Sequence, residues 1–291
     1  MTTLTVTRAG PLTTLQDAGR FGMLAQGVSA SGPMDRGAFA AAGVLLEQLG
    51  TTAIEFTAAG IAFGVDGSLR VGCAGGQFTL NVNGKPREWP ARLGLDDGDT
   101  VEITPGAAGN YGYLRFDREI DVAPLLGSRS TNLTVGLGGL KGRALRVGDR
   151  IAFGGPGGLV PAPAPQTGVD RGPIRVLWGL HADLFDAHAR NEFATSTFTI
   201  STGLDRMGVR LTDPKQMFLS QRRLSLVSDA IVPGDIQILG DGTPIVLMRD
   251  HQPTGGYPRI ATVVSADLDR FAQLRPGTEV RFRPVTLENA R

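Results

Sequence analysis

The chain has 291 residues, of which 41% are hydrophobic and 20% are charged, and its formal net charge is +1. This composition is typical of a soluble globular protein and gives no net field to attract nucleic acid. No apolar run approaches the roughly 18 residues that cross a membrane. Cys73 is the only cysteine, which excludes an internal disulfide, and the N-terminus lacks a signal-peptide pattern, so we expect a cytoplasmic protein.

The first predicted helix runs from Pro33 to about Leu49. Ser31 is placed to cap its start, Pro33 suits its first turn, and Gly50 is placed to end it. The N-terminus of such a helix can bind an anion. The favoured alternative is ordinary capping, in which Asp35 offsets the helix dipole.

Most other segments have the pattern of short strands closed by glycine-containing turns. Phe78–Val82 followed by Asn83-Gly84 predicts a hairpin with a type I′ turn. One phrase occurs three times: a leucine, a turn with glycine at its fourth position, and a strand that alternates apolar and polar residues. It is either a common turn-to-strand device or a sign of two related barrels in tandem, and the positions of the last two copies favour the barrels. The copies are Leu95–Ile103, Leu145–Phe153 and Leu274–Phe282.

A stretch rich in glycine, proline and alanine divides the chain. It predicts a linker at 161–173 between an N-terminal lobe, 1–160, and a C-terminal lobe, 174–291. Within the second lobe, a second helix is predicted from about Ala182 to Phe193. Helices this few among so many strands indicate a mainly-β protein with a few packed helices.

The loop at residues 249–260 carries more polar side chains than a turn requires. Its sequence is Arg-Asp-His-Gln-Pro-Thr-Gly-Gly-Tyr-Pro-Arg-Ile, and apolar strands are predicted on both sides of it. His251 is the imidazole best placed to carry protons near neutral pH, although a structural histidine is the alternative. Amide and hydroxyl side chains can position a ligand, paired glycines allow close approach to the backbone, and a return hairpin brings in a glutamine. The resulting candidate substrate-binding residues are Gln237, Gln252, Thr254, Gly255, Gly256 and Tyr257.

Two other loops place an arginine among polar residues. Arg129 lies between Ser128 and Ser130, and its planar guanidinium suits a carboxylate or phosphate, with a solvated surface arginine as the alternative. Arg206 follows Asp205, and an ion pair between these neighbours that fixes a turn is the alternative to an anion site. The chain has no phosphate-loop or dinucleotide motif, and its three histidines and one cysteine lack metal-ligand spacing, so no metal site is expected.

Six phrases of the chain together resemble one protein family, the C subunit of prokaryotic ATP-dependent 5-oxoprolinase. That family is also called biotin-dependent carboxyltransferase or allophanate hydrolase subunit 2. The phrases run in order from about Leu4 to Phe282, and three positions, Asp229, Asp235 and Pro253, depart from the family pattern. The phrases are Gly-Pro-Leu-Thr-Thr-x-Gln-Asp-x-Gly-Arg, Ser-Gly-x-Met-Asp-Arg, Leu-Gly-Ser-Arg-Ser-Thr, Asp-Arg-Met-Gly, Pro-Gly-x-Ile-Gln and Asp-His-Gln-x-Thr-Gly-Gly-Tyr-Pro.

The resemblance implies two tandem cyclophilin-like β-barrel lobes and two partners, the A and B subunits, which with this chain open 5-oxoproline to glutamate using ATP. Phosphorylation of an amide oxygen makes its carbon electrophilic, so Arg129 and Arg206 would steady the developing negative charge and His251 would transfer protons. Ser128 and Ser130 join the substrate-binding candidates. We expect the chain to be inactive alone, and we expect these segments to meet in one pocket between the lobes.

Two further functions fit the names that the family bears. One is carboxyl transfer from carboxybiotin to a urea-like acceptor. Because no lysine lies between methionines as in a biotin carrier, biotin would have to arrive on another chain. The other is a regulatory role, in which the protein antagonises a kinase inhibitor.

Overall fold

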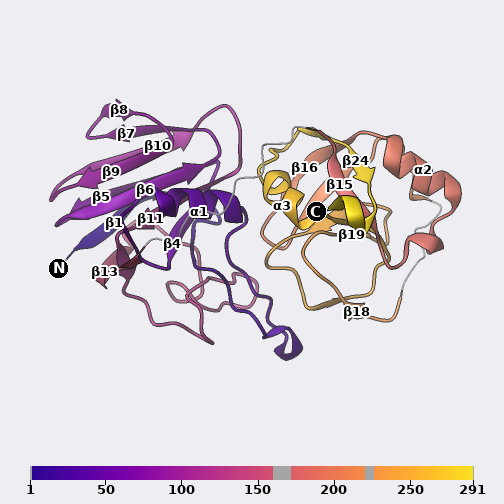
Figure 1. Ribbon diagram of the computed structural model, residues 1–291, viewed down its shortest axis with the longest axis horizontal. Coiled ribbons are helices and arrows are strands. Elements are labelled where there is room, and N and C mark those ends of the chain that lie inside the picture. The colour runs from indigo at the N-terminus through magenta and orange to yellow at the C-terminus, as the bar shows by residue number, and fades with distance from the viewer. Residues whose placement is uncertain (1, 160–171, 220–225, 291) are drawn as a thin grey trace. The chain divides into compact units, whose positions relative to one another are not determined.

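The structure, a computed structural model, describes residues 2–159, 172–219 and 226–290. The chain divides into two compact units (Figure 1). Unit 1 consists of Met1–Phe21 and Ala30–Thr167, and unit 2 consists of Gly22–Ser29 and Gly168–Arg291. Most of the predicted linker, 161–173, lies outside the described residues.

Unit 1 is built from two antiparallel sheets and a small ribbon. The larger sheet has the order β12-β13-β1-β5-β10-β7-β8, the smaller has the order β2-β4-β11-β6-β9, and β3 pairs with β14. The strands are β1 (Thr3–Ala9), β2 (Thr14–Gln16), β3 (Gln48–Leu49), β4 (Ala53–Thr57), β5 (Ile61–Asp66), β6 (Leu69–Gly75), β7 (Phe78–Val82), β8 (Lys85–Arg87), β9 (Ala91–Leu95), β10 (Thr100–Pro105), β11 (Tyr111–Phe116), β12 (Arg118–Ile120), β13 (Arg150–Pro156) and β14 (Gly158–Leu159).

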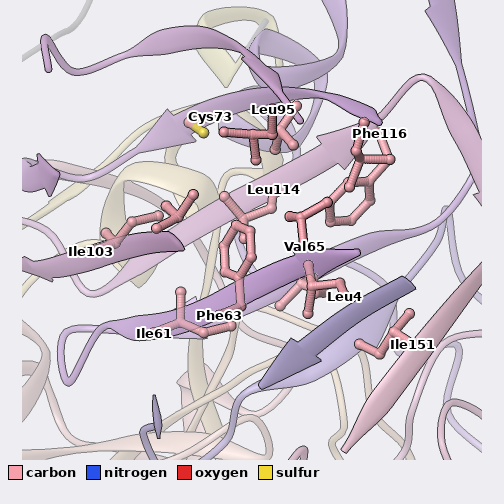
Figure 2. Packing of buried hydrophobic residues seen from close by; sticks show 14 of the residues in the cluster. Leu4, Ile61, Phe63, Val65, Cys73, Leu95, Ile103, Leu114, Phe116 and Ile151 are labelled. Carbon is pink, nitrogen blue, oxygen red and sulfur yellow. The ribbon is translucent and has the colours of Figure 1, made fainter. Parts of the chain in front are cut away.

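The core of unit 1 lies between its two sheets. Along β5, Ile61, Phe63 and Val65 are buried while the residues between them are more exposed, which is the alternation that a half-buried strand requires. They belong to one buried cluster with Leu114 and Phe116 of β11, from the other sheet, and Figure 2 shows these side chains gathered in the interior. Burial of each such side chain contributes roughly 1.5–3 kcal/mol to the free energy of folding. The two sheets therefore form one folding unit.

Unit 2 contains one eight-stranded sheet with the order β23-β16-β17-β20-β19-β22-β15-β24, and a separate ribbon of β18 and β21. The two edge strands of the sheet are consecutive in sequence, and the result is a nearly closed barrel. The mainly-β prediction is confirmed. The strands are β15 (Ile174–Trp178), β16 (Phe198–Leu204), β17 (Gly208–Thr212), β18 (Asp229–Ala230), β19 (Asp235–Ile238), β20 (Pro244–Leu247), β21 (Thr254–Gly255), β22 (Arg259–Val263), β23 (Glu279–Val280) and β24 (Phe282–Pro284).

The three copies of the repeated phrase adopt the same turn. In each, the fourth-position glycine has a positive φ, and a Cβ added there would meet nothing within 4 Å, so the backbone conformation alone requires glycine. Each glycine N–H donates to a carbonyl of a facing strand, and the residue after the glycine accepts a hydrogen bond from that same facing residue. The pairs of turn glycine and facing residue are Gly98 with Val65, Gly148 with Val6, and Gly277 with Ile200.

The first helix, α1 (Arg36–Val44), is shorter than predicted and packs against β6 and β11 (Figure 1). It begins at Arg36 because Asp35, whose side chain accepts a hydrogen bond from the Ala38 N–H at 2.8 Å, is its N-cap. The prediction that Ser31 caps this helix is wrong: the N-cap is Asp35, which the sequence had suggested only as a charge that offsets the helix dipole. The backbone N–H groups of Met34 and Asp35 donate to the Glu55 carboxylate and the Tyr113 hydroxyl, each at 2.8 Å. An anion site at this helix start is therefore not supported.

The second predicted helix is broken in two. A 3-10 turn, η2 (Ala182–Leu184), is followed by α2 (Ala187–Thr195), because Asp186 accepts a hydrogen bond from the Ala189 N–H at 2.7 Å and starts a new helix. A third helix, α3 (Ser265–Ala272), was not predicted. The described ranges also contain the 3-10 turns η1 (Leu24–Gln26) and η4 (Leu287–Ala290). None of the helices in the described ranges has the length and apolar character needed to cross a membrane.

Candidate functional site

A buried carboxylate organises the loop that carries Arg129 in unit 1. Asp17, which follows β2, accepts hydrogen bonds from the Ser128 hydroxyl at 2.6 Å and the Ser130 hydroxyl at 2.7 Å through Oδ1, and from the Arg129 backbone N–H at 2.6 Å through Oδ2. The two serine hydroxyls also accept backbone N–H groups, those of Ser130 and Asp17 respectively, at 3.0 Å. Both predicted substrate-binding serines therefore donate their hydroxyl protons to Asp17.

A second buried residue, Arg20, binds the backbone of the same loop. Its side chain is 1% exposed and donates to the backbone carbonyls of Leu125 at 2.9 Å, Ser128 at 3.2 Å and Ser130 at 2.9 Å. Asp17 and Arg20 were not among the predicted site residues. The signal that could have found them is the Gln-Asp-x-Gly-Arg phrase, because its aspartate and its arginine both form hydrogen bonds with the 125–130 loop.

The Arg129 side chain is the part of this loop with hydrogen-bonding capacity left over. It is partly buried, and its Nε donates to the Val122 carbonyl at 2.6 Å. Its two terminal nitrogens make no hydrogen bond to any residue within the described ranges. The charge of Arg129 also lowers the pKa of the Glu119 carboxyl. A guanidinium whose terminal nitrogens make no hydrogen bond can bind an anion through two donors.

The pKa of the Asp17 carboxyl lies below its usual value of 3.8. Burial acts to raise this pKa, but the hydrogen bonds from Ser128, the Arg129 backbone, Ser130 and the Gly19 backbone together outweigh it. Asp17 is therefore charged at neutral pH, and its charge contributes to the stability of the folded state.

Replacing Asp17 by asparagine is expected to lower the free energy of unfolding at pH 7 by about 1–3 kcal/mol, because an amide cannot accept all these hydrogen bonds. The folded-state pKa of Asp17 is depressed, so its contribution is present above pH 3.8 and is lost as pH falls through the folded-state value. Denaturant unfolding from pH 7 to pH 3 should show the two proteins converging at the acid end. A constant difference across that range would contradict the role assigned to the carboxylate.

In unit 2, the 249–259 loop is fixed by a buried ion pair. Arg206 donates through Nε to Asp250 Oδ2 at 2.9 Å and through Nη2 to Oδ1 at 3.1 Å, and the two side chains are 2% and 1% exposed. The Asp250 N–H also donates to the Arg206 carbonyl at 2.7 Å. Asp205, the partner considered from the sequence, instead accepts the backbone N–H groups of Met207 and Gly208 in the turn. Arg206 is therefore a residue of the loop's support, paired with an acid in the loop itself.

His251 is held in one orientation next to this ion pair. It is 3% exposed, and its Nδ1 lies 2.6 Å from the Gln252 carbonyl. Because a carbonyl only accepts, Nδ1 carries the proton, and the neutral ring then has an unprotonated Nε2. Burial lowers the pKa of His251 below 6.5, although the Gln252 hydrogen bond and the Asp235 and Asp250 carboxylates oppose that shift. His251 is thus a neutral base at physiological pH.

The remaining predicted residues of the loop divide by exposure. Gln252, Thr254 and Tyr257 are exposed and are available to a ligand, with Tyr257 40% exposed. Gly255 and Gly256 have no left-handed φ, so they serve close packing rather than an unusual backbone. Gln237 lies in β19 beside β22, opposite Arg259.

Two of the three departures from the family pattern meet at one arginine. Arg259 donates through Nη2 to Asp229 at 2.6 Å and lies with Nη1 3.5 Å from Asp235. Asp235, which is 2% exposed, also accepts hydrogen bonds from the Thr262 hydroxyl at 2.7 Å and the Val232 N–H at 3.0 Å. Both acids are therefore used inside unit 2. Among the residues that the structure describes, no group of three or more His, Cys, Asp or Glu is placed to hold a metal ion.

Comparison with known proteins identifies the family. A profile of the carboxyltransferase domain, subdomain A and B, matches residues 26–284. The chain belongs to the carboxyltransferase domain family. Within that family it is 35% identical to the 5-oxoprolinase C subunit of Escherichia coli, over 99% of this chain and 93% of the relative. It is 32% identical to the 5-oxoprolinase C subunit of Haemophilus influenzae, over 95% of this chain and 89% of the relative. The resemblance drawn from the six phrases is confirmed.

Solved structures of the same family have the same fold. The urea amidolyase of K. lactis superimposes with a TM-score of 0.89 at 25% identity, covering 99% of this chain and 19% of that enzyme. The urea carboxylase of Kluyveromyces lactis superimposes with a TM-score of 0.88 at 26% identity, covering 99% of this chain and 28% of that enzyme. The chain therefore spans between about a fifth and a third of the length of these carboxyltransferase-family enzymes.

Proposed function

We propose that this protein is the C subunit of an ATP-dependent 5-oxoprolinase complex that opens 5-oxoproline to glutamate. The observation that carries the proposal is the match to a 5-oxoprolinase C subunit over 93% of the relative's length, whereas the urea amidolyase of Lachancea kluyveri is matched over only 17% of its length. The partners are the A and B subunits, and the single cysteine favours a cytoplasmic location.

The geometry of each unit supports a part of this chemistry. Opening a lactam requires a carbonyl made electrophilic, here by phosphorylation of its oxygen with ATP, and a group that moves protons. In unit 2, His251 offers an unprotonated Nε2, and in unit 1, Arg129 offers two unpaired donors for a carboxylate or phosphate.

We expect the purified protein to be inactive alone and active when it is combined with the A and B subunits. The reason is that the chain contains no nucleotide-binding motif of its own. The assay measures ADP and glutamate formation from 5-oxoproline with each of the three proteins alone, in pairs and together. Hydrolysis of ATP in response to 5-oxoproline by this chain without partners would overturn the proposal of a shared active site.

A second function, carboxyl transfer from carboxybiotin to a urea-like acceptor, is favoured by the high TM-scores to urea amidolyase and urea carboxylase. Biotin would then be supplied on another chain. The same preparation, given a carboxylated biotin carrier and urea, separates the two functions. Loss of the carboxyl group from the carrier in response to urea, without glutamate formation from 5-oxoproline, would assign the protein to carboxyl transfer.

A further inference from the structure

The carboxamide of Gln237 is buried without a hydrogen-bond partner for its nitrogen. The residue is 1% exposed, and its Nε2 has no partner among the residues that the structure describes. Two buried carboxylates of the same unit, Asp235 and Asp250, by contrast accept hydrogen bonds from side chains. A buried donor without an acceptor destabilises a fold, so its presence calls for a functional explanation.

The two-glycine segment of the 249–259 loop closes directly over this carboxamide. A Cβ added to Gly255 would lie 2.5 Å from Gln237 Nε2, and one added to Gly256 would lie 2.9 Å from the Leu226 carbonyl oxygen. Neither glycine has a left-handed φ, so close approach is the reason for glycine at both positions. The Gly-Gly pair therefore fits the loop against Gln237 on one side and against the 226 segment on the other.

The cover over Gln237 is a two-stranded ribbon held by backbone hydrogen bonds and by one arginine. Strands β18 and β21 pair through only two residue pairs, Asp229 with Gly255 and Ala230 with Thr254. Arg259 holds the ribbon to the sheet by donating to the Asp229 carboxylate at 2.6 Å and to the Ala230 carbonyl at 2.8 Å. The Leu226 N–H also donates to the Gly256 carbonyl at 2.9 Å, and the Ile231 N–H donates to the Pro253 carbonyl at 3.3 Å, so Gly255 leaves the carboxamide only if these hydrogen bonds are exchanged as well.

We propose that Gln237 determines specificity by pairing with the cis-amide edge of the substrate, which takes the place of Gly255 against the carboxamide when the ribbon lifts. This inference rests on the proposed function. A primary carboxamide presents an acceptor C=O and a donor N–H side by side. A lactam such as 5-oxoproline, whose amide is held cis by the ring, presents the complementary pair, so two parallel hydrogen bonds form. An open-chain trans amide cannot present both groups on one edge.

The test is Gln237→Met in the reconstituted complex, with Gln77→Met, an exposed glutamine of unit 1, as the matched control. Methionine keeps the length of the side chain and removes both hydrogen-bonding groups. We expect the unfolding temperature of the Gln237→Met protein to be unchanged or raised, because an unpaired buried donor is removed. The KM for 5-oxoproline should rise roughly 10-fold to 100-fold, corresponding to two lost hydrogen bonds. The control should change neither quantity.

The N-methyl derivative of 5-oxoproline, which lacks the lactam N–H, supplies the second measurement. The wild-type complex should discriminate strongly against it, and the Gln237→Met complex should lose most of that discrimination. A lowered unfolding temperature with an unchanged KM would mean that the carboxamide is structural and would overturn the inference. Equal discrimination by the wild-type and variant complexes would overturn it as well.

The inference and the proposed function fail in different ways. If 5-oxoproline is turned over but the Gln237→Met variant keeps its KM, the inference is wrong and the function stands. If 5-oxoproline is not turned over, binding of the cyclic urea 2-imidazolidinone to the complex, measured by calorimetry, still tests the pairing. Binding that Gln237→Met abolishes would support the pairing, and binding that the variant retains, or no binding to the wild type, would overturn it.

Discussion

Replacing His251 by alanine is expected to lower kcat of the assembled complex by roughly 10²–10⁴-fold, which is the usual contribution of a positioned proton carrier. The ring is fixed by the 2.6 Å hydrogen bond from Nδ1 to the Gln252 carbonyl, so Nε2 is the basic nitrogen. The matched control is His188→Ala on the exposed side of α2. A loss of less than about 10-fold, with the complex still assembled, would assign His251 a structural role instead.

The pH dependence of this variant provides an independent check. Burial lowers the pKa of His251 below 6.5, so the neutral form that acts as a base persists to more acidic pH than for an exposed histidine. Turnover should therefore decline only as pH falls through a value below 6.5, and that decline should be missing from the residual activity of His251→Ala. The stability of the folded protein should change with pH in the same direction as turnover. The contribution of neutral His251 is present above pH 6.5 and is lost as pH falls through the folded-state pKa.

Local sequence patterns predicted those parts of the fold that local backbone geometry determines. Asn83 and Gly84 both have positive φ, as the type I′ hairpin requires, and the turn glycines Gly98, Gly148 and Gly277 share one conformation. In each case a few adjacent residues determine the conformation, and distant contacts only accommodate it. The mainly-β class follows from these repeated turns and from the alternation of apolar residues between them.

Helix boundaries were predicted less well because distant residues decide them. The backbone N–H groups of Met34 and Asp35 are taken by Glu55 and Tyr113, which lie 21 and 78 residues further along the chain, so α1 begins later than its own pattern indicates. The same limit applies to the site. Asp17 accepts a hydrogen bond from Ser128, which lies 111 residues away in the sequence, and no feature of the 126–131 loop alone points to that acid.

The candidate site separates into residues that hold the loops and residues that remain available. Ser128, Ser130 and Arg206 have their hydrogen-bonding groups engaged by acids of the same unit. Arg129 and His251 keep nitrogen atoms that make no hydrogen bond to any residue the structure describes. Residue type and motif pointed to these loops, but which residues hold each loop and which keep a nitrogen available depends on pairings that only the three-dimensional structure reveals.

Replacing Arg206 by methionine tests this division for the ion pair that supports His251. The change leaves the Asp250 carboxylate buried without its cation, and removal of one partner of a buried pair costs about 3–5 kcal/mol. The exposed pair of Arg150 and Asp66, whose side chains are 65% and 59% exposed, supplies the control. Arg150→Met should cost no more than about 1 kcal/mol in the same denaturant titration.

A second substitution separates support from direct catalysis. In the double variant Arg206→Met with Asp250→Leu, the uncompensated charge is removed, and much of the lost stability should return because an apolar pair of similar volume often replaces a buried ion pair without loss. Activity should recover with stability if Arg206 acts by holding the loop, since His251 would then regain its position. If stability returns while kcat remains as low as in Arg206→Met alone, the guanidinium acts on the substrate directly. A single variant that loses less than about 1 kcal/mol would contradict the structural role altogether, because a pair with both side chains almost fully buried has no solvent to replace the missing partner.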